Sequence, residues 1–340
     1  MIKLWRVTAV NSVIRRSSPL QKHLFPSARQ CLKKAIEMAG ASRRDYWGIP
    51  DYSGHCVISF IGKVTTPVPM RLLSSKNCGG ILVYSQWGWE KPASALIRIR
   101  ERFRKSHAYL LWDRVDSLGA DLSAMARAGD EIADAQIFSL SKTLGLGGGG
   151  LLRAKSTWQV PVYSEEDTDF GNVLEKLKGS SNVLLSHSEI LDRILREDLS
   201  ALPPRLAEWL TNNGLEEAIA SEFAGRRQKL LAVRQVTSRM GFPGWMKNIL
   251  NGDAHVQPGI LPVPVGPEQN VETACRMIQS KFAVEAKPYH FDVSADYLCP
   301  DWRLVVTVPL HSEIPIPLLE SILSFTEKRF GFELPGGSFH

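Results

Sequence analysis

The stretch Phe138-Ser139-Leu140-Ser141-Lys142-Thr143-Leu144-Gly145, followed by Leu146 and glycines at 147–150, decides how this 340-residue chain is interpreted. A lysine between a Ser-x-Ser step and a glycine-rich turn is well placed to present its amine to pyridoxal 5′-phosphate (PLP). The same glycines match G-x-G-x-x-G, but a dinucleotide site needs a helix after them, and Leu151-Leu152-Arg153 has the pattern of a strand. We therefore expect Lys142 to hold PLP as a Schiff base.

Asp113 ends an apolar run, Ala108-Tyr109-Leu110-Leu111-Trp112, upstream of Lys142. An acid at this place can keep the pyridine nitrogen of PLP protonated, which makes the ring an electron sink for a substrate carbanion. Lys142 would then act as a general base once its amine has lost its proton. The cofactor phosphate needs donors, which Ser139 and the helix N-terminus capped by Ser27 can supply.

The order of helical and extended patterns predicts an α/β fold. A capping box at Ser27–Gln30 starts a helix over 28–39 that Gly40 ends. Apolar strands are expected at 64–68, 80–84, 108–113, 134–140 and 150–153, with a basic amphipathic helix at 92–106. Such strands form a mostly parallel sheet covered on both faces, with the active site beyond their carboxyl ends. Asp113 and Lys142 are therefore expected to share one cleft.

Three parts of the chain are expected. Residues 1–24 form an N-terminal arm, residues 25–240 a large PLP-binding domain with interdomain helices, and residues 241–340 a small C-terminal α/β domain. No acid precedes Glu37, so the basic start of the chain fits an arm or a transit peptide. The arm is the favoured interpretation.

Composition narrows the class of protein. The chain is 44% hydrophobic and 22% charged with a net charge of +6, which is typical of a soluble globular protein. Acids are interspersed among the basic residues after position 36, and Arg226-Arg227 are expected on a solvated helix face, so no nucleic-acid surface is predicted. No apolar stretch approaches the ~20 residues that span a bilayer. Five scattered cysteines without a Cys-x-x-Cys pair favour a reducing, cytoplasmic compartment and no metal site.

These motifs together resemble the PLP-dependent aminotransferases of fold type I, and among them the DegT/DnrJ/EryC1/StrS sugar-aminotransferase family, over roughly residues 25–330. The segments that carry the likeness are Ser27-Ala28, Ile49-Pro50-Asp51-Tyr52, Trp87-Gly88, Asp113-Arg114-Val115-Asp116-Ser117-Leu118-Gly119, the 139–150 run, Tyr289-His290-Phe291-Asp292 and Val308-Pro309-Leu310-His311. The resemblance implies a mostly parallel seven-stranded sheet with a small C-terminal α/β domain. It also implies phosphate contacts from Ser27, Ala28 and Ser139, and a homodimer with active sites at the interface.

Some positions depart from the family's pattern or leave alternatives. Asp116 stands where the family usually has a glutamine bonded to the phenolic oxygen of PLP, and a carboxylate there would repel a phenolate unless it is protonated or turned away. Either Tyr52 or His55 is expected to stack on the cofactor ring. Arg303 and His311 are candidates for substrate contact, the arginine for an amino-acid carboxylate.

The predicted function is an aminotransferase that moves an amino group from an amino-acid donor to a keto sugar or another carbonyl intermediate. Lys142 and Asp113 do not select which substrate bond breaks, so a PLP-dependent lyase, decarboxylase or C–C bond-forming enzyme is the first alternative. Asp116 and the short N-terminus leave a second one, a PLP-fold partner protein without turnover.

Overall fold

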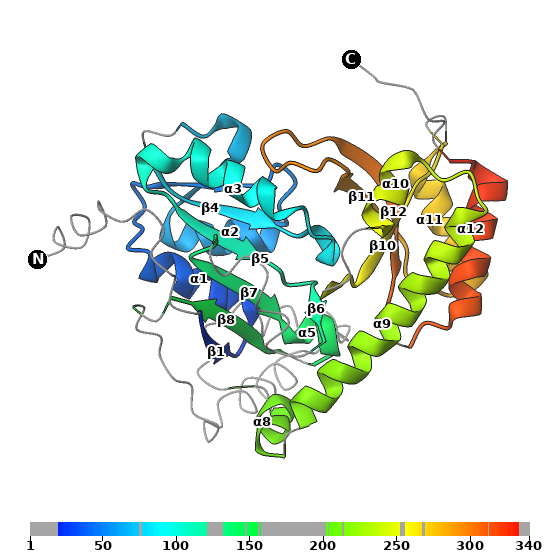
Figure 1. Cartoon of the computed structure of the whole chain (residues 1–340), viewed down its shortest axis with the longest axis horizontal. Helices are drawn as coiled ribbons and strands as arrows, with labels where there is room; N and C mark the ends of the chain where they lie inside the picture. Colours follow the sequence, from blue (N-terminus) through cyan, green and yellow to red (C-terminus); the bar gives the residue numbers. More distant parts are fainter. Residues whose placement is uncertain are drawn as a thin grey trace, which may run out of the picture.

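A seven-stranded sheet forms the centre of the larger lobe in the computed structural model (Figure 1). The structure describes residues 20–74, 77–120, 132–146, 148–155, 157, 202, 204–212, 214–251, 256–266, 269–311 and 313–332. The strands are β1 (Gln21–Phe25), β2 (Tyr46–Ile49), β3 (Thr66–Pro69), β4 (Cys78–Tyr84), β5 (Tyr109–Asp113), β7 (Ala135–Ser139) and β8 (Gly150–Ala154). Their order across the sheet is β1-β8-β7-β5-β4-β2-β3.

The sheet is mostly parallel, as predicted. β2, β3, β4, β5 and β7 pair in parallel, whereas β8 is antiparallel to both of its neighbours, β7 and β1. β7 and β8 are buried at every position, which explains why their sequences read as continuous apolar runs. The predicted strand after the glycines is confirmed as β8.

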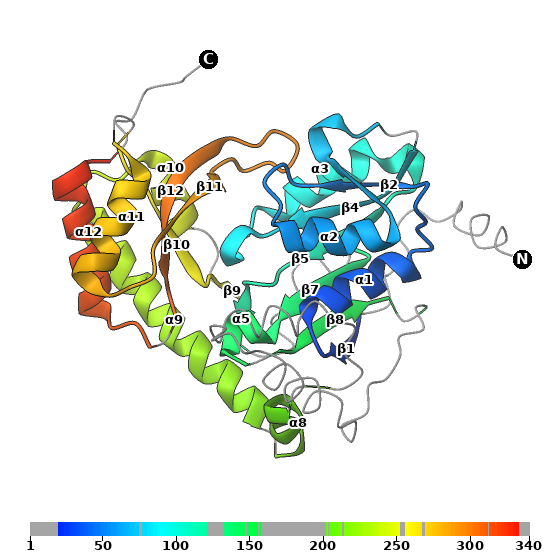
Figure 2. The ribbon, with the colours of Figure 1, turned by 180° about the vertical axis from the view of Figure 1, so that it is seen from behind.

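Helices cover the two faces of this sheet (Figures 1 and 2). These are α1 (Ala28–Met38), α2 (His55–Val64) and α3 (Ala93–Arg102). The larger lobe also contains the short α5 (Leu140–Leu144) and the 3-10 turns η2 (Met70–Leu72), η4 (Gln86–Gly88) and η5 (Arg104–Ser106). Ile36 of α1 packs with Trp47 and Leu111 in one core, and Leu96 of α3 packs with Ile81 in another. Each such buried side chain contributes about 1.5–3 kcal/mol.

The smaller lobe contains an antiparallel sheet of three strands, in the order β10-β12-β11. Its elements are α10 (Gly244–Leu250), β10 (Ile260–Val263), α11 (Val271–Phe282), β11 (Lys287–Asp292), β12 (Trp302–Pro309) and α12 (Ile316–Phe330). The long helix α9 (Gly214–Ser238), preceded by α8 (Pro204–Thr211), runs from the larger lobe to the smaller one (Figure 1). Beside it, β6 (Leu118–Gly119) pairs with β9 (Val256–Gln257).

One expectation needs correction at this level. Arg226 is 1% exposed on α9, whereas its neighbour Arg227 is exposed, so only Arg227 lies on the predicted solvated face. Gln21–Phe25 form the edge strand β1, which overlaps the segment 1–24 predicted as an arm. The domain limits remain predictions.

Within the part of the chain that the structure describes, no helix combines the length and apolar character needed to cross a membrane. The cysteines at 31, 56, 78, 275 and 299 are all free.

Candidate active site

Lys142 and Asp113 come from neighbouring parallel strands. Asp113 is the last residue of β5, and α5 begins directly after β7, which pairs with β5. The Ser139 hydroxyl caps α5 by accepting a hydrogen bond from the Lys142 backbone N–H at 3.2 Å, and Gly145 ends the helix with φ 66°. A short capped helix thus places Lys142 over the carboxyl end of the sheet.

The Lys142 amine contacts Asp116. Its Nζ lies 3.3 Å from each carboxylate oxygen of Asp116. Tyr84, the last residue of β4, donates its hydroxyl hydrogen to Asp116 Oδ2 at 2.6 Å, and the Trp87 backbone N–H donates to the Tyr84 oxygen at 3.1 Å. The Lys142 side chain is 54% exposed, whereas that of Asp116 is 8% exposed, so the lysine reaches from solvent toward a buried acid.

Burial and charge shift the pKa values of this cluster. Burial raises the pKa of Asp113 to about 7, against the lowering effects of Lys142 and of the Val115 N–H. Burial lowers the pKa of the Lys142 amine, but the carboxylates of Asp116 and Asp113 outweigh it, so this pKa lies above its ordinary value. Burial, reinforced by Asp116, holds the pKa of Tyr84 well above its usual range. Two carboxyl groups, those of Asp113 and Asp116, therefore lie around the one amine of Lys142.

A cradle of backbone lies next to this cluster, where α1 and α5 both begin. Gly150 pairs with Phe25 on one side and with Ser139 on the other, and Gly149 forms a bridge with Ser27. A Cβ on Gly150 would lie 2.5 Å from the backbone carbon of Ser27, so only glycine permits this approach. The close contact brings two helix N-termini to one edge of the sheet.

Ser27 and Ser139 both use their hydroxyls as helix caps. Ser27 Oγ accepts the Gln30 N–H at 3.2 Å and donates to Gln30 Oε1 at 3.2 Å, so the predicted capping box is confirmed. Ala28 is the first residue of α1, and no acidic residue lies in its first turn. Such a helix start is positive and has backbone N–H groups to offer to an anion. The donor set therefore fits a phosphate group.

The two candidates for ring stacking lie in different surroundings. The Tyr52 ring stacks on His290 of the smaller lobe at 4.2 Å and meets Trp302 edge-on at 4.8 Å. His55 is exposed at the start of α2, with Nδ1 3.5 Å from Ser59 Oγ. The next residue, Cys56, lies near enough to the Lys142 amine to act on it electrostatically, which places this end of α2 toward the lysine.

The two candidates for substrate contact, Arg303 and His311, lie near opposite ends of the strand β12. Arg303 lies near one end of β12, where its Nε is 3.2 Å from Asp301 Oδ1. His311 follows the other end of β12, with Nδ1 3.2 Å from Arg226 Nη2. The same Arg226 nitrogen donates to Thr143 O at 3.0 Å, so His311 rather than Arg303 is connected to the helix of Lys142.

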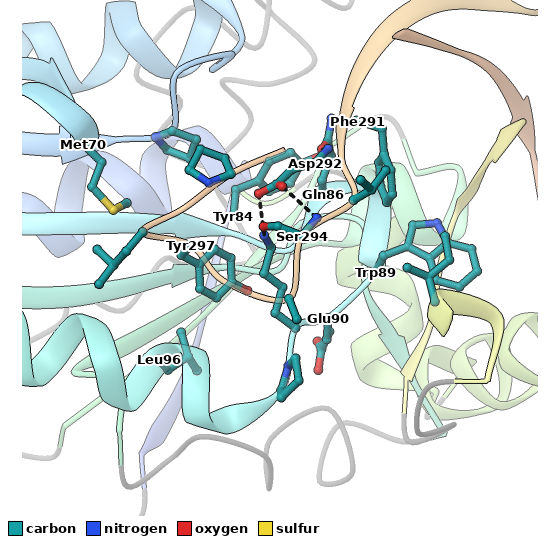
Figure 3. Close-up of a pocket in the computed structure, with 18 of the residues that line it drawn as sticks. Met70, Tyr84, Gln86, Trp89, Glu90, Leu96, Phe291, Asp292, Ser294 and Tyr297 are labelled. Carbon is teal, nitrogen blue, oxygen red and sulfur yellow. Dashed lines mark hydrogen bonds and ion pairs between the residues drawn. The ribbon is translucent and has the colours of Figure 1, made fainter. Parts of the chain in front are cut away.

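A cavity of about 680 Å³ separates the two lobes (Figure 3). Aromatic side chains line much of it, among them Tyr84, Trp89, Tyr297 and Trp302. Neither Lys142 nor Asp113 belongs to its lining, but Tyr84 does, and its hydroxyl bonds to the acid that holds Lys142. Tyr84 is thus the structural link between the cavity and the lysine.

Sequence analysis missed Tyr84, Gln86 and Lys91. Gln86 Nε2 donates to His290 O at 2.6 Å, and its Oε1 accepts the Asp292 N–H at 3.0 Å. Lys91 Nζ donates to Asp292, to Ser294 Oγ and to Asp296 O. The one signal for Tyr84 was its place at the end of an apolar strand, in register with Asp113.

The fold matches that of solved PLP-dependent enzymes. A DegT/DnrJ/EryC1/StrS aminotransferase from Brucella abortus superimposes with a TM-score of 0.54 at 9% identity, covering 92% of this chain and 87% of that one. A protein described as a sugar aminotransferase from Streptococcus pneumoniae, in its PLP form, gives 0.56 at 14% identity over 91% and 88% of the two chains. No protein-family model matches the chain, and no curated protein matches its sequence.

A third similar structure has another activity. The 8-amino-7-oxononanoate synthase of Francisella tularensis gives a TM-score of 0.52 at 14% identity, covering 90% of this chain and 81% of that one. The chain therefore has the fold type I architecture of the PLP-dependent enzymes. Aminotransferases and a synthase share that architecture, so the reaction must be argued from the site.

Proposed function

We propose that this protein binds PLP and is an aminotransferase. The observation that carries the proposal is the meeting of Lys142, Asp113 and the N-terminus of α1 at one sheet edge in this fold. Lys142 and Asp113 would hold the aldehyde and the ring nitrogen, and Ser27, Ala28 and Ser139 the phosphate. Bound PLP supplies an aldehyde for amine exchange and an electron-withdrawing ring.

In this account the residues of the chain bind the ring and move protons. The buried Asp113 carboxylate would hold the pyridine N–H, and that cationic partner would in turn favour the ionised acid. Lys142, once displaced by the substrate amine, would shuttle the proton between the substrate α-carbon and the cofactor. Its exposed stem lets the amine move between these positions. His55 is the better candidate to stack on the ring, because the Tyr52 ring already stacks on His290.

The cavity between the lobes supports a bulky acceptor. Its aromatic walls suit a ring that presents an apolar face and polar edges, as a keto sugar does, and we propose a keto sugar or another carbonyl biosynthetic intermediate as acceptor. An amino acid would be the donor. His311 is a candidate for its recognition through the contact with Arg226, whereas Arg303 faces Asp301.

A second function also needs a test, because the synthase shares the fold over 90% of this chain, with a TM-score of 0.52 against 0.56 for the aminotransferase from Streptococcus pneumoniae. Lys142 and Asp113 would serve equally in a lyase, a decarboxylase or a C–C bond-forming enzyme. A third possibility is a catalytically inactive partner protein with the PLP fold, and Asp116 beside the lysine supports it.

A spectral screen separates these functions. The PLP-loaded protein is mixed with single amino acids, and the absorbance of the cofactor is followed while products are analysed. An aminotransferase converts PLP to pyridoxamine phosphate and releases the oxo acid, and a carbonyl acceptor reverses the change. Release of CO₂ or ammonia without pyridoxamine phosphate would support the alternative reaction, and no spectral response to any amino acid would support the inert partner.

We also propose a homodimer in the cytoplasm. On α2, His55, Cys56 and Ile58 are exposed, and Ile58 is 39% exposed although it is apolar. A second copy over this face would cover the approach to Lys142. Light scattering should give twice the mass of 37.9 kDa, and Ile58→Asp should shift the protein toward monomer. A monomeric wild type would contradict the proposal.

A further inference from the structure

The acid nearest to the Lys142 amine is Asp116, a residue that no role in the proposed function requires. Both of its oxygens lie 3.3 Å from Nζ, so the amine faces the carboxylate evenly. That distance allows a charge-assisted hydrogen bond to either oxygen. Asp113 acts on the same amine through its charge.

Asp116 is held from two sides. The Tyr84 hydroxyl fixes its side chain through Oδ2 at 2.6 Å, and the Trp87 N–H fixes Tyr84. Gly88 has φ 89°, and a Cβ on it would lie 2.7 Å from the Asp116 carbonyl oxygen. The turn η4 therefore packs directly on the backbone of Asp116, so the carboxylate has little freedom to turn away from Lys142.

The titratable groups around the pair come from four elements. Asp113 at the end of β5 and Cys56 on α2 act on Lys142, and Tyr84 on β4 and Arg226 on α9 interact with Asp116. Arg226 is buried, and its guanidinium approaches the Asp116 segment across Gly259. With these neighbours, an anion at 116 favours the ammonium form of Lys142.

We propose that Asp116, oriented by Tyr84, controls the protonation of Lys142 by holding its amine in the ammonium form in the cofactor-free protein. The inference rests on the proposed function, because Lys142 must lose this proton to act as nucleophile or base.

The test titrates Lys142 in the cofactor-free protein. Reductive methylation with limiting formaldehyde at a series of pH values modifies neutral amines only, and mass spectrometry of the peptides reports Lys142 separately from other lysines. Asp116→Asn should lower the pKa of Lys142 by about 1–3 units, which makes its methylation at pH 8 about tenfold faster or more. Asp116→Glu, which keeps the charge, should stay near the wild type.

Two controls accompany this titration. Lys91, which pairs with Asp292, should react alike in every variant, and Asp51→Asn removes a cavity carboxylate that pairs with Arg71 instead of Lys142. Tyr84→Phe should shift the pKa less than Asp116→Asn, because the charge remains. Should Asp116→Asn not fold, Asp116→Ser gives the same measurement.

An unchanged Lys142 pKa in folded Asp116→Asn or Asp116→Ser protein would overturn the inference. The proposed function is tested separately. It would be wrong if PLP did not bind, whereas the titration of Lys142 uses the cofactor-free protein.

Discussion

At the residue scale, the buried Asp113 carboxyl lowers the stability of the cofactor-free protein near neutral pH, although the proposed chemistry needs it. Burial raises its pKa to about 7 from an ordinary 3.8. Between those values the unfolded chain has released a proton that the folded protein keeps, so the folded state loses stability as pH rises through this window. Below 3.8 the carboxyl is protonated in both states and contributes nothing. A cationic ring nitrogen would remove this cost.

Asp113→Asn is therefore expected to flatten the pH dependence of stability in the cofactor-free protein. The free energy of unfolding of the wild type should fall relative to the variant between about pH 4 and pH 7, by an amount on the order of a few kcal/mol. Urea denaturation at several pH values measures it. The control Asp301→Asn removes an exposed carboxylate and should keep the wild-type slope. Parallel slopes for the wild type and Asp113→Asn would contradict the buried, protonated state.

At the scale of elements, the start of α1 combines a structural and a binding role. Ser27→Ala should cost about 1 kcal/mol of stability through loss of the N-cap. It should also weaken PLP binding more than binding of pyridoxal, which lacks the phosphate. Asn270→Ala removes an equivalent cap from α11, where Asn270 accepts the Thr273 N–H, and should leave PLP affinity unchanged. Equal losses of PLP and pyridoxal affinity would argue against a phosphate at Ser27.

Close packing between β8 and the start of α1 explains why position 150 is a glycine. Gly150→Ala should destabilise the protein by about 1–3 kcal/mol, because its Cβ would lie 2.5 Å from the Ser27 backbone. Gly62→Ala on α2 is the matched control, since a Cβ there meets nothing within 4 Å, and it should be neutral or stabilising by up to about 1 kcal/mol. Urea midpoints compare the two. Equal stability of both variants would show that α1 and β8 do not need this close approach.

The elements also show what the sequence could predict. Local signals located α1 through Ser27, and apolar periodicity located most strands of the sheet. β1 was missed because its five residues carry a polar, exposed edge pattern. The Tyr84–Asp116 bond depends on the register of β4 with β5 and on the turn after it, which no local pattern encodes. Arg226 was misplaced for the same reason, because its partners Thr143 and His311 are distant in sequence.

At the scale of the whole molecule, residues that line the cavity connect the two lobes. Gln86 bonds to the backbone of β11, and Lys91 enters the loop between β11 and β12, where Arg98 adds a pair with Asp296 at 3.0 Å. Tyr297 and Leu298 of that loop pack into the α3 core. Because these contacts bury polar groups with their partners, the cavity is expected to keep its shape without ligand.

The variant Lys91→Met tests how much this connection between the lobes contributes to stability. The Lys91 side chain is 11% exposed and that of Asp292 9%, and breaking such a buried pair costs about 3–5 kcal/mol. The free energy of unfolding should fall accordingly, and proteolysis in the loop 293–301 should become faster. Lys34→Met breaks the half-exposed pair with Glu37 and should cost less than about 1 kcal/mol. A Lys91→Met protein as stable as Lys34→Met would show that the loop is not held by this amine.

The account depends most on the amine of Lys142, and borohydride reduction tests it directly. The purified protein is incubated with PLP, reduced, digested and mapped by mass spectrometry. We expect loss of the visible absorbance band and one phosphopyridoxyl group on Lys142, with none on Lys142→Ala. A label on other lysines with Lys142 unmodified, or no label at all, would contradict the central claim.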